Sequence, residues 1–126
     1  MHRFLLALVA AAWLAGPAAA QVQRAFPATA LRGALVIGQA PDVTLNGRPA
    51  RLAPGARIRD TNNMAVVPSA VLGGRFVVHY TVDTSGLLKD VWILRPEEVA
   101  VRPWPTTPVE ARAWTFNPAA QVWVKP

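Results

Sequence analysis

The sequence predicts a mainly β domain, built either as a small antiparallel sandwich or as a partly open barrel. Three observations support this prediction. Short runs of β-branched and aromatic residues recur along the chain, turns rich in glycine, proline and asparagine separate them, and one turn is Asn46-Gly47. Asn-Gly between two short apolar runs predicts a hairpin, because both residues tolerate the positive φ angles of a type I′ turn.

The first twenty residues predict a secretory signal peptide. A basic residue, Arg3, precedes an unbroken apolar run from Phe4 to Ala15, and Ala18-Ala19-Ala20 provides the small residues that signal peptidase accepts. The run spans about 12 residues, whereas a membrane-spanning helix needs about 20. We therefore expect cleavage after Ala20, a mature chain that begins at Gln21, and a periplasmic or secreted protein with no transmembrane span.

Residues 21–30 are polar and interrupted by proline, which predicts an extended N-terminus. The β domain is expected to follow over residues 31–102. In its first half the apolar runs predict five short strands, with a break at Ala53-Pro54-Gly55. These strands are residues 31–38, 43–45, 48–52, 56–59 and 64–67.

The second half of the β domain contains the predicted central hairpin. Residues 76–82 and 88–94 are both rich in β-branched and aromatic residues, and Asp83-Thr84-Ser85-Gly86 lies between them. A four-residue turn that ends in glycine suits an antiparallel connection.

Residues 103–126 form a tail rich in proline and tryptophan, which we expect to pack on the domain. The stretch Thr107-Pro108-Val109-Glu110 predicts the start of one short helix, to about Trp114, with Thr107 as its N-cap. An edge strand is predicted at 121–124. The large aromatic side chains are each worth about 2 kcal/mol or more when buried, so we expect the tail to close an open face or edge of the barrel.

The composition excludes several kinds of site. The chain has no cysteine, which excludes disulfides, thiolate metal sites, a thiol nucleophile and a lipid-anchored N-terminal cysteine. The full chain carries a net charge of +6. Loss of Arg3 with the signal peptide leaves 12 basic against 7 acidic residues, so the mature chain carries +5.

Four arginines lie within twelve residues and are the candidate ligand-binding residues. They are Arg48, Arg51, Arg57 and Arg59. Guanidinium groups gathered on one surface suit phosphate, carboxylate or an anionic membrane surface. The alternative is that these arginines are the solvated positions of a β-hairpin.

No catalytic constellation is recognisable. His79 is the only histidine beyond the predicted signal peptide, the only serines are Ser69 and Ser85, and the carboxylates form no metal-binding pattern. We therefore predict a protein that is not an enzyme and has no catalytic residue, no metal and no cofactor. The enzymatic alternative is a small hydrolase centred on His79.

Residues 43–94 contain four distinctive stretches, which are 45–52, 54–59, 62–63 and 91–94. In these stretches the chain resembles small exported proteins of Gram-negative bacteria to which no activity is assigned. The resemblance implies an export signal and a small domain, and it implies no particular chemistry.

Another set of residues is similar to the periplasmic C-terminal domain of TonB-type energy transducers. These residues are Val82-Asp83, Gly86, the apolar stretch 91–94 and Trp114-Thr115-Phe116-Asn117-Pro118. The chain departs from that pattern because it has no retained anchor, no long proline-rich spacer, and a proline-broken segment before Trp114. The likeness implies a shared β-hairpin arrangement, and fold likeness carries no function.

Two functional hypotheses follow. The first is an exported, non-enzymatic binding or structural protein of the cell envelope, which acts through the four arginines or through a sheet edge. The second is a protein that binds anionic polymers or lipid headgroups through the same four arginines. The partner is unknown, with an envelope protein and an anionic surface as the two expected kinds.

Overall fold

The computed structural model describes residues 23–126. The predicted signal peptide, residues 1–20, lies outside the described residues, as do residues 21–22 of the predicted extended N-terminus. Within residues 23–126, no helix is long and apolar enough to cross a membrane.

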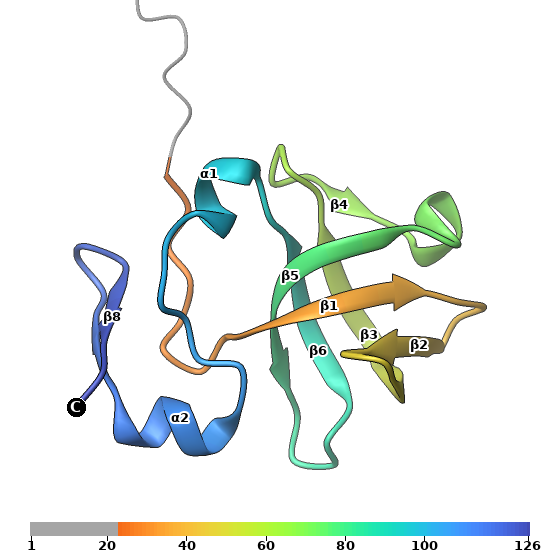
Figure 1. Ribbon diagram of the computed structural model, residues 1–126. Coiled ribbons are helices and arrows are strands. Elements are labelled where there is room, and N and C mark those ends of the chain that lie inside the picture. The colour runs from red at the N-terminus through yellow and green to blue at the C-terminus, as the bar shows by residue number, and fades with distance from the viewer. Residues whose placement is uncertain (1–22) are drawn as a thin grey trace, which may run out of the picture.

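The described chain is mainly β, as the sequence predicts, and its helices are short (Figure 1). The strands are β1 (Leu31–Ile37), β2 (Asp42–Leu45), β3 (Arg48–Arg59), β4 (Ala65–Val66), β5 (Arg75–Val82), β6 (Leu88–Ile93), β7 (Thr115–Asn117) and β8 (Val122–Val124). The helices are the 3-10 helix η2 (Pro68–Val71), α1 (Pro96–Val99) and α2 (Pro108–Ala113). The structure has two short α-helices, whereas the sequence predicted one. The predicted helix corresponds to α2.

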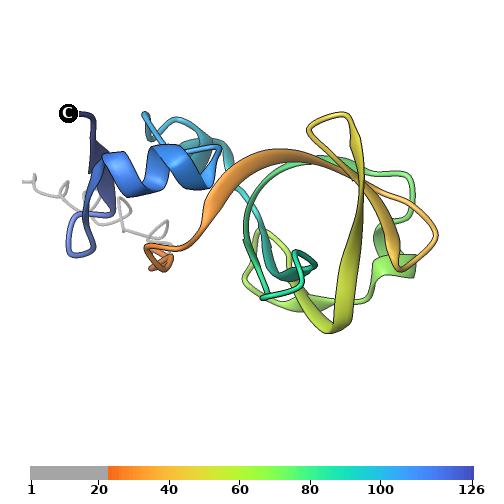
Figure 2. The same ribbon diagram turned by 90° about the horizontal axis from the view of Figure 1, so that it is seen from below.

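Five strands pair in a ring and form a partly closed barrel, which Figure 2 shows nearly end-on. The hydrogen-bonded order is β2-β1-β5-β6-β3-β4, and a further pairing between β2 and β3 completes the ring. The predicted barrel is thus confirmed. Strand β3 runs parallel to β6, however, so the barrel contains one parallel pair that the antiparallel prediction did not include.

The hairpin between β2 and β3 turns at Asn46-Gly47, as predicted. Asn46 has a φ of 54° and Gly47 a φ of 81°, and the flanking residues Leu45 and Arg48 are paired. Both positive φ angles match a type I′ turn. The Asn46 side chain adds a hydrogen bond, since its Oδ1 accepts from the backbone N–H of Ala34 at 2.9 Å.

The predicted break at residues 53–55 is wrong, because β3 continues through it as one strand of 12 residues. Gly55 has a φ of 78°, and the register with β6 shifts between Leu52 and Arg57. The irregularity bends the strand without ending it, as a bulge does. One end of β3 therefore pairs with β2, and the other pairs with β6 and β4.

The central hairpin of β5 and β6 is confirmed, and its alternation separates two hydrophobic clusters. Val78 and Tyr80 of β5 and Val91 and Ile93 of β6 face the barrel interior, where they are 0 to 7 % exposed. The intervening residues point outward, because successive side chains in a strand lie on opposite faces. His79 is one of them, and it lies opposite Trp92.

The tail and the N-terminal segment, residues 23–30, cover this outer face together. They form a second cluster beside the barrel, in which the buried residues are Phe26, Ala30, Leu94, Trp104 and Trp123. Figure 2 shows α2 and the C-terminal segments to one side of the ring. The sequence predicted that the tail packs on the barrel, but it did not predict that the N-terminal segment packs with the tail.

Helix α2 begins as its sequence predicts. Pro108 occupies the first turn, and the side-chain oxygen of the N-cap Thr107 accepts from the backbone N–H of Glu110 at 3.2 Å. The helix ends at Ala113, and the chain then returns as β7, which pairs with β8. The predicted edge strand at 121–124 corresponds to β8.

An amide pairing joins the two ends of the described chain. The Gln121 side chain accepts from the backbone N–H of Phe26 at 2.9 Å and donates to its carbonyl at 3.3 Å. Gln121 is buried, so these bonds are shielded from water. They tie the N-terminal segment to the turn before β8.

Candidate functional site

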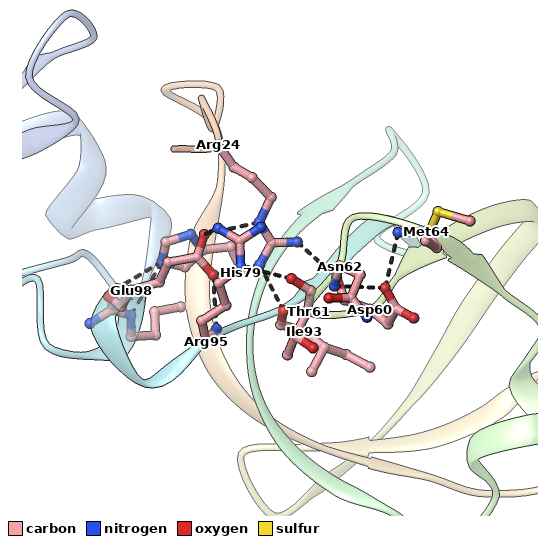
Figure 3. Close-up of polar contacts among 10 residues, drawn as sticks. Arg24, Asp60, Thr61, Asn62, Met64, His79, Ile93, Arg95 and Glu98 are labelled. Carbon is pink, nitrogen blue, oxygen red and sulfur yellow. Dashed lines mark hydrogen bonds and ion pairs between the residues drawn. The ribbon is translucent and has the colours of Figure 1, made fainter. Parts of the chain in front are cut away.

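A buried arginine holds the N-terminal segment against the end of the barrel (Figure 3). Arg24 is 7 % exposed and binds both carboxylate oxygens of Glu98. It also donates to the backbone carbonyls of Asp60 at 3.0 Å and Ile93 at 2.8 Å. A guanidinium bound at two carboxylate oxygens is both strongly and directionally held, which offsets the cost of burying its charge.

Glu98 in α1 is the carboxylate that Arg24 binds. Besides Arg24, its side chain accepts from the backbone N–H of Arg95 at 2.8 Å and lies 3.6 Å from the Arg95 guanidinium. Burial alone raises the pKa of Glu98, but the hydrogen bonds and positive charges of Arg24 and Arg95 outweigh burial and lower it overall. Glu98 is therefore ionised at neutral pH and is shared by two arginines.

Arg32 on β1 uses all five of its N–H groups within the protein. It donates to the carbonyls of Glu98, Val99 and Val101 and to Nε2 of His79. These partners are neutral, so they satisfy the hydrogen bonds of Arg32 without cancelling its charge. Burial and the nearby charge of Arg102 lower the pKa of Arg32.

His79 is held as a neutral, buried side chain. It is 1 % exposed and stacks on Trp104, with ring centroids 4.0 Å apart. Burial, and then the charges of Arg32 and Arg24, lower the pKa of His79 to about 2. An imidazole with this pKa, whose Nε2 already accepts from Arg32, is a poor proton acceptor at neutral pH.

A cleft of about 870 Å³ lies between residues 102–106, which precede α2, and the C-terminal residues 123–125, and we call it the Trp cleft. Its lining includes Trp104, Trp114, Trp123, Arg32, Arg102 and Lys125. Trp104 and Trp123 are buried and form its floor, whereas Trp114 is half-buried. Arg32, Arg102 and Lys125 are opposed by a single lining carboxylate, Glu110, so the lining carries a net charge of +2.

The charged groups of the Trp cleft differ in what they can offer a ligand. The Lys125 ammonium lies 5.3 Å from the centroid of the Trp114 ring, a cation–π distance. Arg102 is exposed and forms no ion pair within residues 23–126. Hydrogen bonds from the backbone N–H and the hydroxyl of Thr106 to Oε1 of Glu110 lower the pKa of that carboxyl.

A second cleft, of about 650 Å³, lies where the N-terminal segment meets the far end of β3, and we call it the Arg cleft. Its lining includes Arg24, Arg59, Arg95, Asn62, Asn63 and Trp92. The Arg59 guanidinium lies 5.9 Å from the Trp92 ring centroid. The two clefts share no lining residue.

The four arginines predicted as a ligand site all lie on β3, but they are distributed along it. Arg48 and Arg59 line separate clefts. Arg51 pairs with Asp42 at 3.3 Å on the surface, and Arg57 lies in register with Asp90 of β6. Their joint action on an anionic ligand stays a prediction.

Sequence reasoning missed Arg24, Arg32, Arg102 and Lys125. Their partners are distant in sequence, as with Arg24 and Glu98, which are 74 residues apart. One local indication existed for Arg32, which is a lone charge within the apolar strand 31–37. The tail tryptophans were recognised as packing residues and not as the lining of a cleft.

The described residues contain no group of three or more histidine, cysteine, aspartate or glutamate side chains arranged to hold a metal ion. Comparisons of the chain with known protein families, curated proteins and solved structures find no match. The function is therefore inferred from the geometry of the two clefts.

Proposed function

We propose that the chain is an exported, non-enzymatic binding protein of the cell envelope, and that the Trp cleft is its ligand site. The ligand class is an organic anion with a flat apolar part. The observation that carries the proposal is the lining itself, in which three indole side chains lie among three cations and one carboxylate.

The two halves of this lining have complementary roles. Aromatic walls bury the apolar surface of a ligand, and a few polar groups fix its orientation. Arg32 supplies charge without free donors, because the protein uses all five of its N–H groups. Arg102 and Lys125 are exposed and can donate directly to an anionic group.

The state of His79 supports binding over hydrolysis. The imidazole is buried, its Nε2 is occupied by Arg32, and its pKa is about 2. A hydrolase centred on His79 needs an imidazole that accepts a proton near neutral pH. His79 instead stacks on Trp104 and so supports the floor of the cleft.

Binding of 8-anilinonaphthalene-1-sulfonate, a flat aromatic anion, tests the site. The double variant Arg102→Gln/Lys125→Gln is expected to bind the dye at least about tenfold more weakly, since a charge-assisted hydrogen bond is worth about 1.5–3 kcal/mol. Dye fluorescence titrated against each protein measures the affinity. The double variant Arg75→Gln/Lys89→Gln is the matched control, because it removes two exposed cations that do not line the cleft. Equal weakening in this control, or no dye binding by the unaltered protein, contradicts the proposal.

The location in the envelope is tested separately. When the chain is expressed in a Gram-negative host, mass spectrometry of the envelope fraction is expected to find an N-terminus at Gln21. Leu8→Arg interrupts the apolar run and is expected to leave the chain in the cytoplasm with residues 1–20 still attached. If the unaltered chain, without the Leu8→Arg substitution, keeps Met1, this result contradicts export.

A further inference from the structure

The Arg cleft is lined almost entirely by hydrogen-bond donors. Seven of its eight lining residues carry a side-chain N–H group, and none carries a carboxylate. Amide side chains can present either their oxygen or their nitrogen, whereas arginine and tryptophan nitrogens only donate. A concave surface with this lining is chemically suited to an anion and unsuited to a cation.

The charges at the Arg cleft are only partly balanced within the protein. Arg24 and Arg95 share the carboxylate of Glu98. Arg59 lies over the ring of Trp92 and forms no ion pair within residues 23–126. The three guanidinium groups exceed the carboxylates beside the cleft, those of Glu98 and Asp60, by one positive charge, which attracts an anion.

The carboxylate of Asp60 binds backbone N–H groups of its own loop. One of its oxygens accepts from the backbone N–H groups of Asn62 at 2.9 Å and Met64 at 3.0 Å. Asp60 therefore shapes the loop that carries Asn62 and Asn63 into the lining of the cleft.

Two arginines from other segments also donate hydrogen bonds to the backbone of this loop (Figure 3). Arg24 donates to the carbonyl of Asp60 at 3.0 Å, and Arg95 donates to the carbonyl of Thr61 at 2.7 Å. The loop and two of the three guanidinium groups are thus held in place before any ligand arrives, which lowers the entropic cost of binding.

We propose that the Arg cleft is a second binding site, separate from the Trp cleft, and that it binds a phosphate group. A phosphate dianion presents several oxygen acceptors to converging donors, and planar guanidinium groups match this geometry. Arg59 is the residue that reaches the ligand, because Arg24 and Arg95 are already engaged with Glu98. The phosphate belongs either to a soluble ester or to a lipid headgroup.

Indole signals in ¹H–¹⁵N NMR spectra test the proposal, because Trp92 lines only the Arg cleft and Trp114 lines only the Trp cleft. The four tryptophans that follow Ala20 can be assigned with single Trp→Phe variants. Titration with inorganic phosphate is expected to shift the Trp92 signal and to leave the Trp114 signal in place. Arg59→Gln is expected to weaken phosphate binding at least tenfold.

Two variants of equal charge control the experiment. Arg75→Gln removes an exposed arginine at the start of β5, outside both clefts, and is expected to change phosphate affinity less than twofold. Arg48→Gln changes the opposite end of β3. A loss in Arg48→Gln or Arg75→Gln equal to that in Arg59→Gln overturns the proposal, because net charge or a joint arginine site then explains the binding.

Vesicles separate the two sources of phosphate. Binding to phosphatidylglycerol vesicles that depends on Arg59, and that phosphatidylcholine vesicles do not show, identifies a lipid headgroup. Binding of free phosphate without vesicle binding identifies a soluble ester. If neither probe shifts the Trp92 signal, the proposal is wrong, whatever the dye titration shows for the Trp cleft.

Discussion

Replacing Glu98 by alanine is expected to lower the free energy of unfolding by about 3–5 kcal/mol, since removal of one partner leaves a buried charge uncompensated. The uncompensated charge is that of Arg24, which is 7 % exposed. Urea denaturation measures the change through the midpoint of unfolding. Glu97→Ala is the matched control, because Glu97 is an exposed carboxylate in the same helix, and we expect its effect to stay within about 0.5 kcal/mol. Equal midpoints for the two variants would show that the pair contributes nothing.

Glu98 also makes the free energy of unfolding depend on pH. The pKa of Glu98 is lower in the folded protein than its ordinary value of about 4.3, so the unfolded chain takes up the proton first as the pH falls. The stabilisation is fully present above that ordinary value and is lost as the pH falls through the lower pKa of the folded state. Glu98→Gln is expected to flatten this part of the stability profile, and an unchanged profile contradicts the assignment.

Replacing Trp104 by alanine is expected to lower the free energy of unfolding by about 3–5 kcal/mol, as large aromatic deletions in a core do. Trp104 is 6 % exposed, stacks on His79, and donates its indole N–H to the carbonyl of Ala30 at 3.0 Å. The deletion leaves both a cavity and an unpaired carbonyl. Thermal unfolding measures the loss, which corresponds to a decrease of about 12 °C or more in melting temperature.

Trp104→Phe separates packing from the hydrogen bond. It keeps an aromatic ring against His79 and loses the bond to Ala30, so we expect a loss of about 1–3 kcal/mol. If Trp104→Ala melts at the same temperature as the unaltered protein, the second cluster does not contribute to the stability of the domain.

The parts of the fold that could be predicted are those encoded locally. The Asn46-Gly47 turn requires positive φ at two neighbouring residues, and the start of α2 requires a capping side chain at Thr107. The β5–β6 hairpin joins adjacent segments of strongly β-forming residues. Each of these features is decided within about twenty neighbouring residues, so the sequence reveals it directly.

The features that sequence reasoning missed depend on distant partners. Pro54 and Gly55 suggested a turn, but the parallel pairing of β3 with β6 and the positive φ of Gly55 allow the strand to bend and continue. The continuous strand distributes the four predicted arginines along its length. Of these four arginines only Arg59 lines the Arg cleft, and the other side chains that complete the cleft, such as Trp92 and Asn62, come from other segments.

The pairing of Gln121 with Phe26 has a consequence for how the protein is made. The two residues are 95 positions apart, and synthesis proceeds from the N-terminus, so Phe26 emerges long before Gln121. The barrel strands, which lie within residues 31–93, can pair as soon as β6 is available. The Phe26 ring packs against His79, Trp92 and Trp104, which emerge earlier, but the Phe26 backbone must wait for Gln121 before it finds its partner. The order of assembly is therefore the reverse of the order of synthesis for this segment, which is made before the barrel and docks after it.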